Sequence, residues 1–165
     1  MRIFSGLYKG INIKTSSRLS YRPTKAIVRK SIYDRFNNLE SKSVLDLFSG
    51  SGTIGFEALS RGAKSIAFVE KDIKIFQMLI KNSKKFPKTN IKFYNMDVFS
   101  FLKLKSTFDF IYADPPYGKY NVNLLVEKIL RRLNHNGVFI LECQKKENLN
   151  SNSKMLDFGN SRLLI

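Results

Sequence analysis

The sequence contains a single cysteine, Cys143, and a single histidine, His135. One cysteine cannot form an intrachain disulfide, and these two residues alone cannot supply the ligands of a tetrahedral zinc site, so we expect chemistry without a metal. No apolar run approaches the ~20 residues that a membrane span needs, and residues 1–4 lack the basic-then-apolar layout of a signal peptide. These absences favour a cytoplasmic protein that has no membrane partner.

Acidic residues are also scarce, with 13 Asp and Glu against 29 Lys and Arg, which gives a formal net charge of +16 and a pI near 10.0. An excess of this size in a small domain favours a polyanionic partner such as nucleic acid. Basic residues cluster between positions 18 and 30, where an ordinary solvated helix face is the alternative interpretation. The expected nucleic-acid contacts are Lys9, Arg22, Thr24 and Arg29, although Thr24 is also a plausible N-cap of the following helix.

The alternation of apolar segments with amphipathic segments predicts an α/β fold in one domain that spans residues 1–165. Residues 1–14 read as a short hairpin, with turns at Gly6 and Gly10, inside a basic N-terminal arm of residues 1–22. Strands are expected at 43–48, 65–69, 91–95, 108–113, 137–142, 154–158 and 162–165. Helices are expected at about 24–36, 71–85, 98–104 and 121–133. A further helix is expected after the loop that follows residue 48, ending at about residue 61.

A glycine-rich loop follows the first core strand. Gly50, Gly52 and Gly55 fit the pattern G-x-G-x-x-G between a strand and a helix, and Glu70 lies twenty residues after Gly50 at the end of the next strand. Glycines let the backbone approach a ligand closely, and a carboxylate at the tip of the second strand can accept both ribose hydroxyls. The pattern therefore predicts a nucleoside-binding half of the fold, but it fits a dinucleotide enzyme equally well.

Asp46 lies inside the strand before this loop, and it distinguishes S-adenosylmethionine from NAD as the expected cofactor. A carboxylate there suits a cofactor with an amine and a sulfonium and does nothing for a pyrophosphate, so S-adenosylmethionine fits better than NAD. Asp46 can alternatively orient the loop by accepting backbone N–H groups. Asp97, after the third strand, is placed to accept the adenine amine, with Val98 or Phe99 against the adenine ring, or to cap the next helix. The expected cofactor site comprises Asp46, Phe48, Gly50, Ser51, Gly52, Glu70, Asp97 and Val98.

The run Asp114-Pro115-Pro116-Tyr117 ends the fourth strand, at the edge of the sheet where ligands bind in open α/β folds. Asp114 offers carboxylate oxygens, Pro115 offers a carbonyl, and Tyr117 offers a flat ring. Two acceptors can hold the two N–H bonds of an exocyclic amine while the ring stacks on an unstacked base. The three residues are the expected catalytic group, and a rigid turn is the alternative interpretation.

Five segments together resemble the bacterial 16S rRNA guanine-N2 methyltransferases of the RsmD type, over nearly the whole chain. These segments are Arg22-Pro23-Thr24, residues 45–52, residues 57–63, Val69-Glu70 and Asp114-Pro115-Pro116-Tyr117. The loop and the Asp-Pro-Pro-Tyr motif are shared with many amino-methyltransferases, whereas the Arg-Pro-Thr arm is more specific. After that arm, Lys25-Ala26-Ile27 replace the acidic and basic residues usual in the family.

The resemblance implies a class I, Rossmann-like methyltransferase with a seven-stranded, mostly parallel sheet and helices on both faces. It also implies S-adenosylmethionine as methyl donor and 16S rRNA, in the small ribosomal subunit or its precursor, as substrate. We expect the protein to act as a monomer. Two alternatives remain open, namely a DNA adenine-N6 or cytosine-N4 methyltransferase and an RNA-binding assembly factor without catalytic activity.

Overall fold

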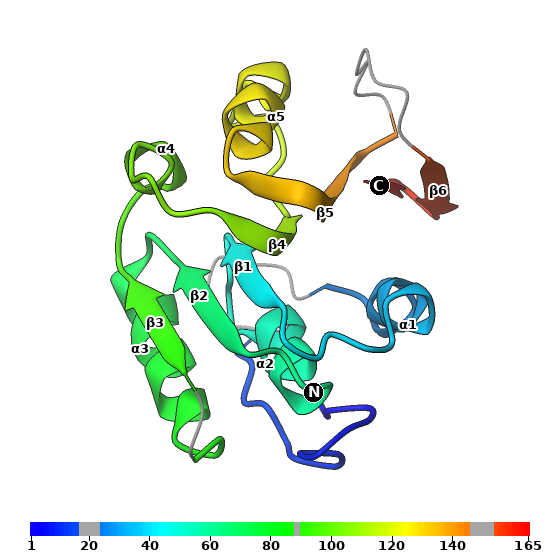
Figure 1. Ribbon diagram of the computed structural model, residues 1–165, viewed down its shortest axis with the longest axis vertical. Coiled ribbons are helices and arrows are strands. Elements are labelled where there is room, and N and C mark those ends of the chain that lie inside the picture. Colours follow the sequence, from blue (N-terminus) through cyan, green and yellow to red (C-terminus); the bar gives the residue numbers. More distant parts are fainter. Residues whose placement is uncertain (17–23, 88–89, 146–153) are drawn as a thin grey trace.

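A seven-stranded sheet forms the centre of the computed structural model, which describes residues 1–16, 24–87, 90–145 and 154–165 (Figure 1). The strand order is β3-β2-β1-β4-β5-β7-β6. The strands are β1 Ser43–Leu47, β2 Ser65–Val69, β3 Ile91–Tyr94, β4 Phe108–Ala113, β5 Leu133–Gln144, β6 Met155–Phe158 and β7 Ser161–Leu164. Strands β1 to β5 pair in parallel, whereas β7 pairs antiparallel with both β5 and β6, so the predicted mostly parallel sheet is confirmed.

Helices cover both faces of this sheet, as predicted (Figure 1). The helices are α1 Ala26–Arg35, α2 Thr53–Ser60, α3 Ile73–Ser83, α4 Val98–Phe101 and α5 Val122–Leu130. Because side chains alternate along a strand, Phe110 of β4 joins the core under α1, α2 and α3, and Ile111 joins the core under α4 and α5. Both faces are therefore apolar, which explains the continuous apolar runs of the parallel strands.

Several predicted element boundaries are wrong: α4 ends at Phe101 rather than 104, α5 ends at Leu130 rather than 133, and the starts of α1 and β5 also differ. Helix α1 begins at Ala26 after Lys25, which makes no side-chain cap, and the Thr24 hydroxyl lies instead 3.2 Å from the hydroxyl of Tyr112. Strand β5 begins at Leu133 rather than at residue 137, because Leu133 pairs with Phe108 ahead of an irregular step in the register. At these two starts a long-range pairing decides the boundary, and local sequence preference does not.

The predicted N-terminal hairpin is present and packs on α2. Arg2 forms an antiparallel bridge with Asn12, and the side chains of Ile3 and Ile13 are buried. The fully buried carboxylate of Glu57 accepts the N–H groups of Phe4 and Ser5, at 2.7 and 3.1 Å. The described part of the arm is therefore an integral layer of the domain. No helix among the described residues is long and apolar enough to cross a membrane.

Candidate functional site

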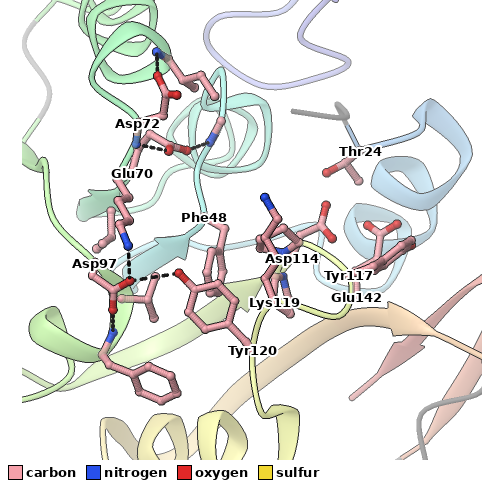
Figure 2. A pocket seen from close by; sticks show the side chains of 18 of the residues that line it. Thr24, Phe48, Glu70, Asp72, Asp97, Asp114, Tyr117, Lys119, Tyr120 and Glu142 are labelled. Carbon is pink, nitrogen blue, oxygen red and sulfur yellow. Dashed lines mark hydrogen bonds and ion pairs between the residues drawn. The ribbon is translucent and has the colours of Figure 1, made fainter. Parts of the chain in front are cut away.

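A cavity of about 1230 Å³ opens at the carboxyl ends of the parallel strands (Figure 2). Acidic residues near the carboxyl ends of four strands on the two sides of β1 line it, namely Glu70 after β2, Asp97 after β3, Asp114 after β4 and Glu142 within β5. Strand order reverses between β1 and β4, and such a switch point is where open α/β sheets bind ligands. Figure 2 shows Glu70 and Asp97 on one side of the cavity and Asp114, Tyr117 and Glu142 on the other.

The loop from β1 to α2 forms one wall of the cavity. Gly50 lines the cavity, and its N–H donates to Glu70 Oε2 at 2.9 Å. Gly52 has a φ of +82°, and a Cβ there would lie 2.5 Å from Leu79 Cδ1, so a larger residue would move the loop away from α3. The two glycines thus have different roles: Gly50 lets the loop backbone lie close to Glu70 at the cavity, and Gly52 lets the loop pack tightly against the Leu79 side chain of α3. Ser51 and Gly52 do not line the cavity.

Asp46 lies behind the loop and outside the cavity lining. Its side chain is 1% exposed, and Oδ2 accepts the N–H of Gly55 at 2.9 Å. Burial raises the pKa of Asp46 well above its ordinary value, against the effect of the Gly55 hydrogen bond and with a further contribution from the charge of Glu70. The structure therefore shows Asp46 in the loop-orienting role that the sequence also allowed, behind the cavity wall.

Glu70 connects the loop to the start of α3. Its Oε1 accepts the N–H of Asp72 at 2.9 Å, while Oε2 accepts that of Gly50. Burial raises the pKa of Glu70, and the hydrogen bonds from Asp72 and Gly50 oppose that shift. A carboxylate has about four lone-pair sites, so two backbone contacts leave acceptor capacity on the cavity side.

Asp97 is the N-cap of α4, as one of the two sequence interpretations proposed, and it also lines the cavity. Oδ1 accepts the Phe99 N–H at 2.9 Å, and Oδ2 accepts from Lys71 Nζ at 3.2 Å and from the Tyr120 hydroxyl at 3.1 Å. Partial burial works against ionisation of Asp97, but these hydrogen bonds outweigh it and keep its pKa below the ordinary value. The carboxylate is therefore ionised and held in place at neutral pH.

Tyr120 is a cavity residue that the sequence interpretation missed. Its ring meets the Phe48 ring edge to face, with 4.9 Å between the centroids, and the tilted Phe99 ring lies 5.8 Å away. Burial, followed by the hydrogen bond to Asp97, raises the pKa of Tyr120 to about 12, so it remains a donor. Its only signal in the sequence was an aromatic residue shortly after the Asp-Pro-Pro-Tyr motif.

Asp114, Pro115 and Tyr117 all line the cavity, as expected for residues at the end of β4. Pro115 is buried, Asp114 is half-buried, and Tyr117 is 38% exposed. The Tyr117 hydroxyl lies 3.1 Å from Ser161 Oγ at the start of β7, which ties the motif to the antiparallel end of the sheet. A carboxylate, a carbonyl and an aromatic ring thus surround one end of the cavity.

Among the expected nucleic-acid contacts, Lys9 is exposed, Arg22 lies outside the described residues, and Thr24 is buried at the cavity. Arg29 is corrected by the structure, because its side chain is 1% exposed and its guanidinium lies 4.0 Å from the centre of the Phe4 ring. Burial lowers the pKa of Arg29, partly offset by the charge of Glu57. The hairpin covers this residue, so it cannot contact a phosphate in this structure.

Phe48 and Val98 complete the predicted cofactor residues that line the cavity, whereas Glu142 and Lys119 are lining residues that were not predicted. Glu142 carried the same signal as Glu70 and Asp97, an acid at a strand's carboxyl end. Among the described residues, no group of three or more His, Cys, Asp or Glu could hold a metal ion.

Comparisons with known proteins match nearly the whole chain. The family model described as Conserved hypothetical protein 95 matches residues 1–162. Ribosomal RNA small subunit methyltransferase D of Escherichia coli (strain K12) is 32% identical over 83% of this chain and 68% of that protein. The protein of the same name from Buchnera aphidicola subsp. Acyrthosiphon pisum is 30% identical over 89% of this chain and 80% of that one. The solved structure of yhhF from Escherichia coli, described as a methyltransferase, is 25% identical and has a TM-score of 0.86, covering 99% of this chain and 95% of that one.

Proposed function

The chain belongs to the family described as Conserved hypothetical protein 95, the RsmD family of rRNA methyltransferases, and from this membership we propose that it methylates the exocyclic N2 amine of a guanine in 16S rRNA. The match over residues 1–162 confirms the family that the sequence predicted. One observation carries the proposal. Two acids suited to a nucleoside, Glu70 and Asp97, line the same cavity as the amine-accepting pair Asp114 and Pro115.

The residues on the β2 and β3 side fit S-adenosylmethionine. Glu70, Asp97 and Val98 line the cavity, and in the proposed complex Glu70 accepts the ribose hydroxyls, Asp97 accepts the adenine amine, and Val98 lies against the adenine ring. The aromatic pair Phe48 and Tyr120 adds apolar surface for a flat ring. When bound, S-adenosylmethionine supplies an electrophilic methyl group on a sulfonium. A dinucleotide would need room for a pyrophosphate near Gly50, where the Glu70 carboxylate already holds the loop N–H.

Asp114, Pro115 and Tyr117 hold the target amine. The lone pair of an exocyclic amine is delocalised into the base, so this nitrogen is a poor nucleophile until it becomes pyramidal. Asp114 and the Pro115 carbonyl each accept one N–H, which favours that geometry, while the Tyr117 ring stacks on the extruded base. Catalysis then consists mostly of positioning. The proton leaves to Asp114 or to water.

The proposed substrate is 16S rRNA in the small ribosomal subunit or its precursor, with the enzyme acting as a cytoplasmic monomer. A DNA enzyme that reads sequence places side chains against base edges in a groove, which generally takes an added recognition element. The described strands form a single sheet, and the hairpin is packed on α2. A structured RNA that presents its base unpaired lowers the few kcal/mol that base flipping costs.

The proposal is tested by nucleoside analysis of 16S rRNA and DNA from a strain that lacks this gene. We expect the rRNA of that strain to lack an N2-methylguanine that returns on complementation. Purified protein should restore it by labelled methyl transfer to small subunits from the deletion strain, with weaker activity on naked duplex DNA. Loss of N6-methyladenine or N4-methylcytosine from DNA, with rRNA unchanged, would contradict the proposal in favour of a DNA enzyme.

RNA binding should depend on exposed cations and not on Arg29. Lys25 and Lys119 are exposed and line the cavity. We expect Lys25→Ala and Lys119→Ala each to reduce the slope of log affinity against log salt concentration by about 0.7 to 0.9, the value for one phosphate contact. Arg22→Ala, at the expected contact outside the described residues, should do the same.

Arg29→Met serves as the matched control, because it removes a cation that is buried under the hairpin. Fluorescence anisotropy with labelled RNA at several salt concentrations measures all four slopes. A reduced slope for Arg29→Met would show that the hairpin opens on RNA, and unchanged slopes for the other three variants would locate the RNA elsewhere.

A further inference from the structure

Glu142 is a buried acid of the cavity that the proposed mechanism does not use. It is 5% exposed and lines the cavity near the end of β5. In the parallel pairing of β4 and β5, Ala113 is paired with Leu141, so Asp114 and Glu142 are the next residues along the two strands. Neighbouring strands lie about 4.8 Å apart, which brings the two carboxylates to the same end of the cavity (Figure 2).

The geometry points to Glu142 as the acceptor of the guanine N1–H, and therefore as a residue that selects guanine over adenine and cytosine. This inference rests on the proposed methylation of a guanine N2 amine. Strand order supports it, since β4 and β5 lie on the opposite side of β1 from β2 and β3. Glu70 and Asp97 belong to the proposed cofactor side, so Glu142 belongs to the side that holds the target base.

A buried hydrogen-bond chain fixes the orientation of Glu142. The Tyr112 hydroxyl donates to Glu142 Oε2 at 2.8 Å, and the Thr24 hydroxyl lies 3.2 Å from that of Tyr112. Because Tyr112 gives its one proton to Glu142, Thr24 is the donor in the second bond. The hydrogen bond that Glu142 receives from a described residue is accepted by Oε2. The lone pairs of Oε1 are therefore left for a ligand.

The chemistry of the three amino-bearing bases makes this position discriminating. Guanine presents the N1–H donor next to its N2 amine, so Asp114 and Pro115 can accept the amine while Glu142 accepts N1–H. Adenine presents the N1 lone pair next to its N6 amine, and cytosine presents N3 next to N4. Either lone pair would face the Glu142 carboxylate, and a site built for a donor strongly rejects a base that lacks it.

A base analogue isolates this contact from methyl transfer itself. The substrate is a small subunit reconstituted with 16S rRNA in which the methylated guanosine is replaced by 2,6-diaminopurine riboside. The analogue keeps the 2-amino group that accepts the methyl but carries a lone pair at N1 and an amine in place of the O6 carbonyl, and the comparison with Glu142→Gln separates the change at N1 from the change at position 6. We expect wild-type kcat/KM to favour guanosine by about 10- to 150-fold, the range for one hydrogen bond to a charged group.

Glu142→Gln should remove most of that preference, because its amide can donate to the N1 lone pair of the analogue. Its amide oxygen can still accept from Tyr112, so the buried chain is kept. The matched control is Glu127→Gln, on the exposed face of α5, which should retain the wild-type preference. Thermal unfolding and calorimetric binding of S-adenosylhomocysteine establish that each variant is folded.

Each outcome decides a separate point. A folded Glu142→Gln variant with the wild-type preference would overturn the inference and leave the proposed function intact. If Glu142→Gln does not fold, the wild-type ratio decides: a preference within the expected range supports the inference, and equal kcat/KM for the two substrates overturns it. Absence of transfer by wild-type protein to the guanosine-bearing subunit would overturn the proposed function, and the inference with it.

Discussion

Replacing Asp114 by alanine should lower kcat for methyl transfer by roughly 10²- to 10³-fold, the cost of losing one positioned polar group that acts on the reacting atom. The substitution removes one of the two acceptors that hold the amine in a pyramidal geometry, and the Pro115 carbonyl alone cannot fix the lone pair toward the methyl donor. Single-turnover methyl transfer to small subunits from the deletion strain measures the effect.

The cofactor side of the cavity should be unaffected by this change. Asp114 lies after β4, across the cavity from Glu70 and Asp97 (Figure 2), so S-adenosylhomocysteine affinity is expected to remain within severalfold of wild type. Asp34→Ala is the matched control, because Asp34 is an exposed aspartate on α1 that pairs with Lys30 at 3.9 Å. Turnover of Asp114→Ala above a few per cent of wild type would show that Asp114 does not hold the amine.

Replacing Glu70 by alanine should weaken S-adenosylmethionine binding by about 1.5 to 3 kcal/mol, the range for hydrogen bonds to a charged group, which is about 10- to 150-fold in Kd. Two effects add. The ribose loses its acceptor, and the backbone N–H groups of Gly50 and Asp72 lose the carboxylate that orders the loop and the start of α3. Isothermal titration calorimetry measures the change.

Glu127→Ala is the matched control for Glu70→Ala. Glu127 is an exposed glutamate of α5, and its ion pair with Arg131 lies on the surface. Its cofactor affinity should equal that of wild type. Unchanged affinity in Glu70→Ala would remove Glu70 from the cofactor site. Wild-type protein that binds NAD but neither S-adenosylmethionine nor S-adenosylhomocysteine would reverse the choice of cofactor.

The sequence predicted the elements that position the site because those elements carry local signals. The apolar runs at Ser65–Val69 and Phe108–Ala113 match β2 and β4 residue for residue, since strands buried on both faces read as continuous apolar segments. Because the strands are parallel, the residues that closely follow their carboxyl ends lie at the same edge of the sheet. Glu70, Asp97 and Asp114 were therefore found in one cavity from their positions in the chain alone.

The tertiary structure decided which long side chains reach that cavity and which are covered. Arg29 has the sequence signal of a surface cation, but the hairpin brings Phe4 over it, and no pattern around residue 29 reports a contact 25 residues away. Tyr120 reaches Asp97, and Tyr112 reaches Glu142, through contacts between different strands and loops. Local patterning specifies where a residue lies along its strand or helix, whereas burial and hydrogen-bond partners depend on segments that meet only when the sheet and its covering layers assemble.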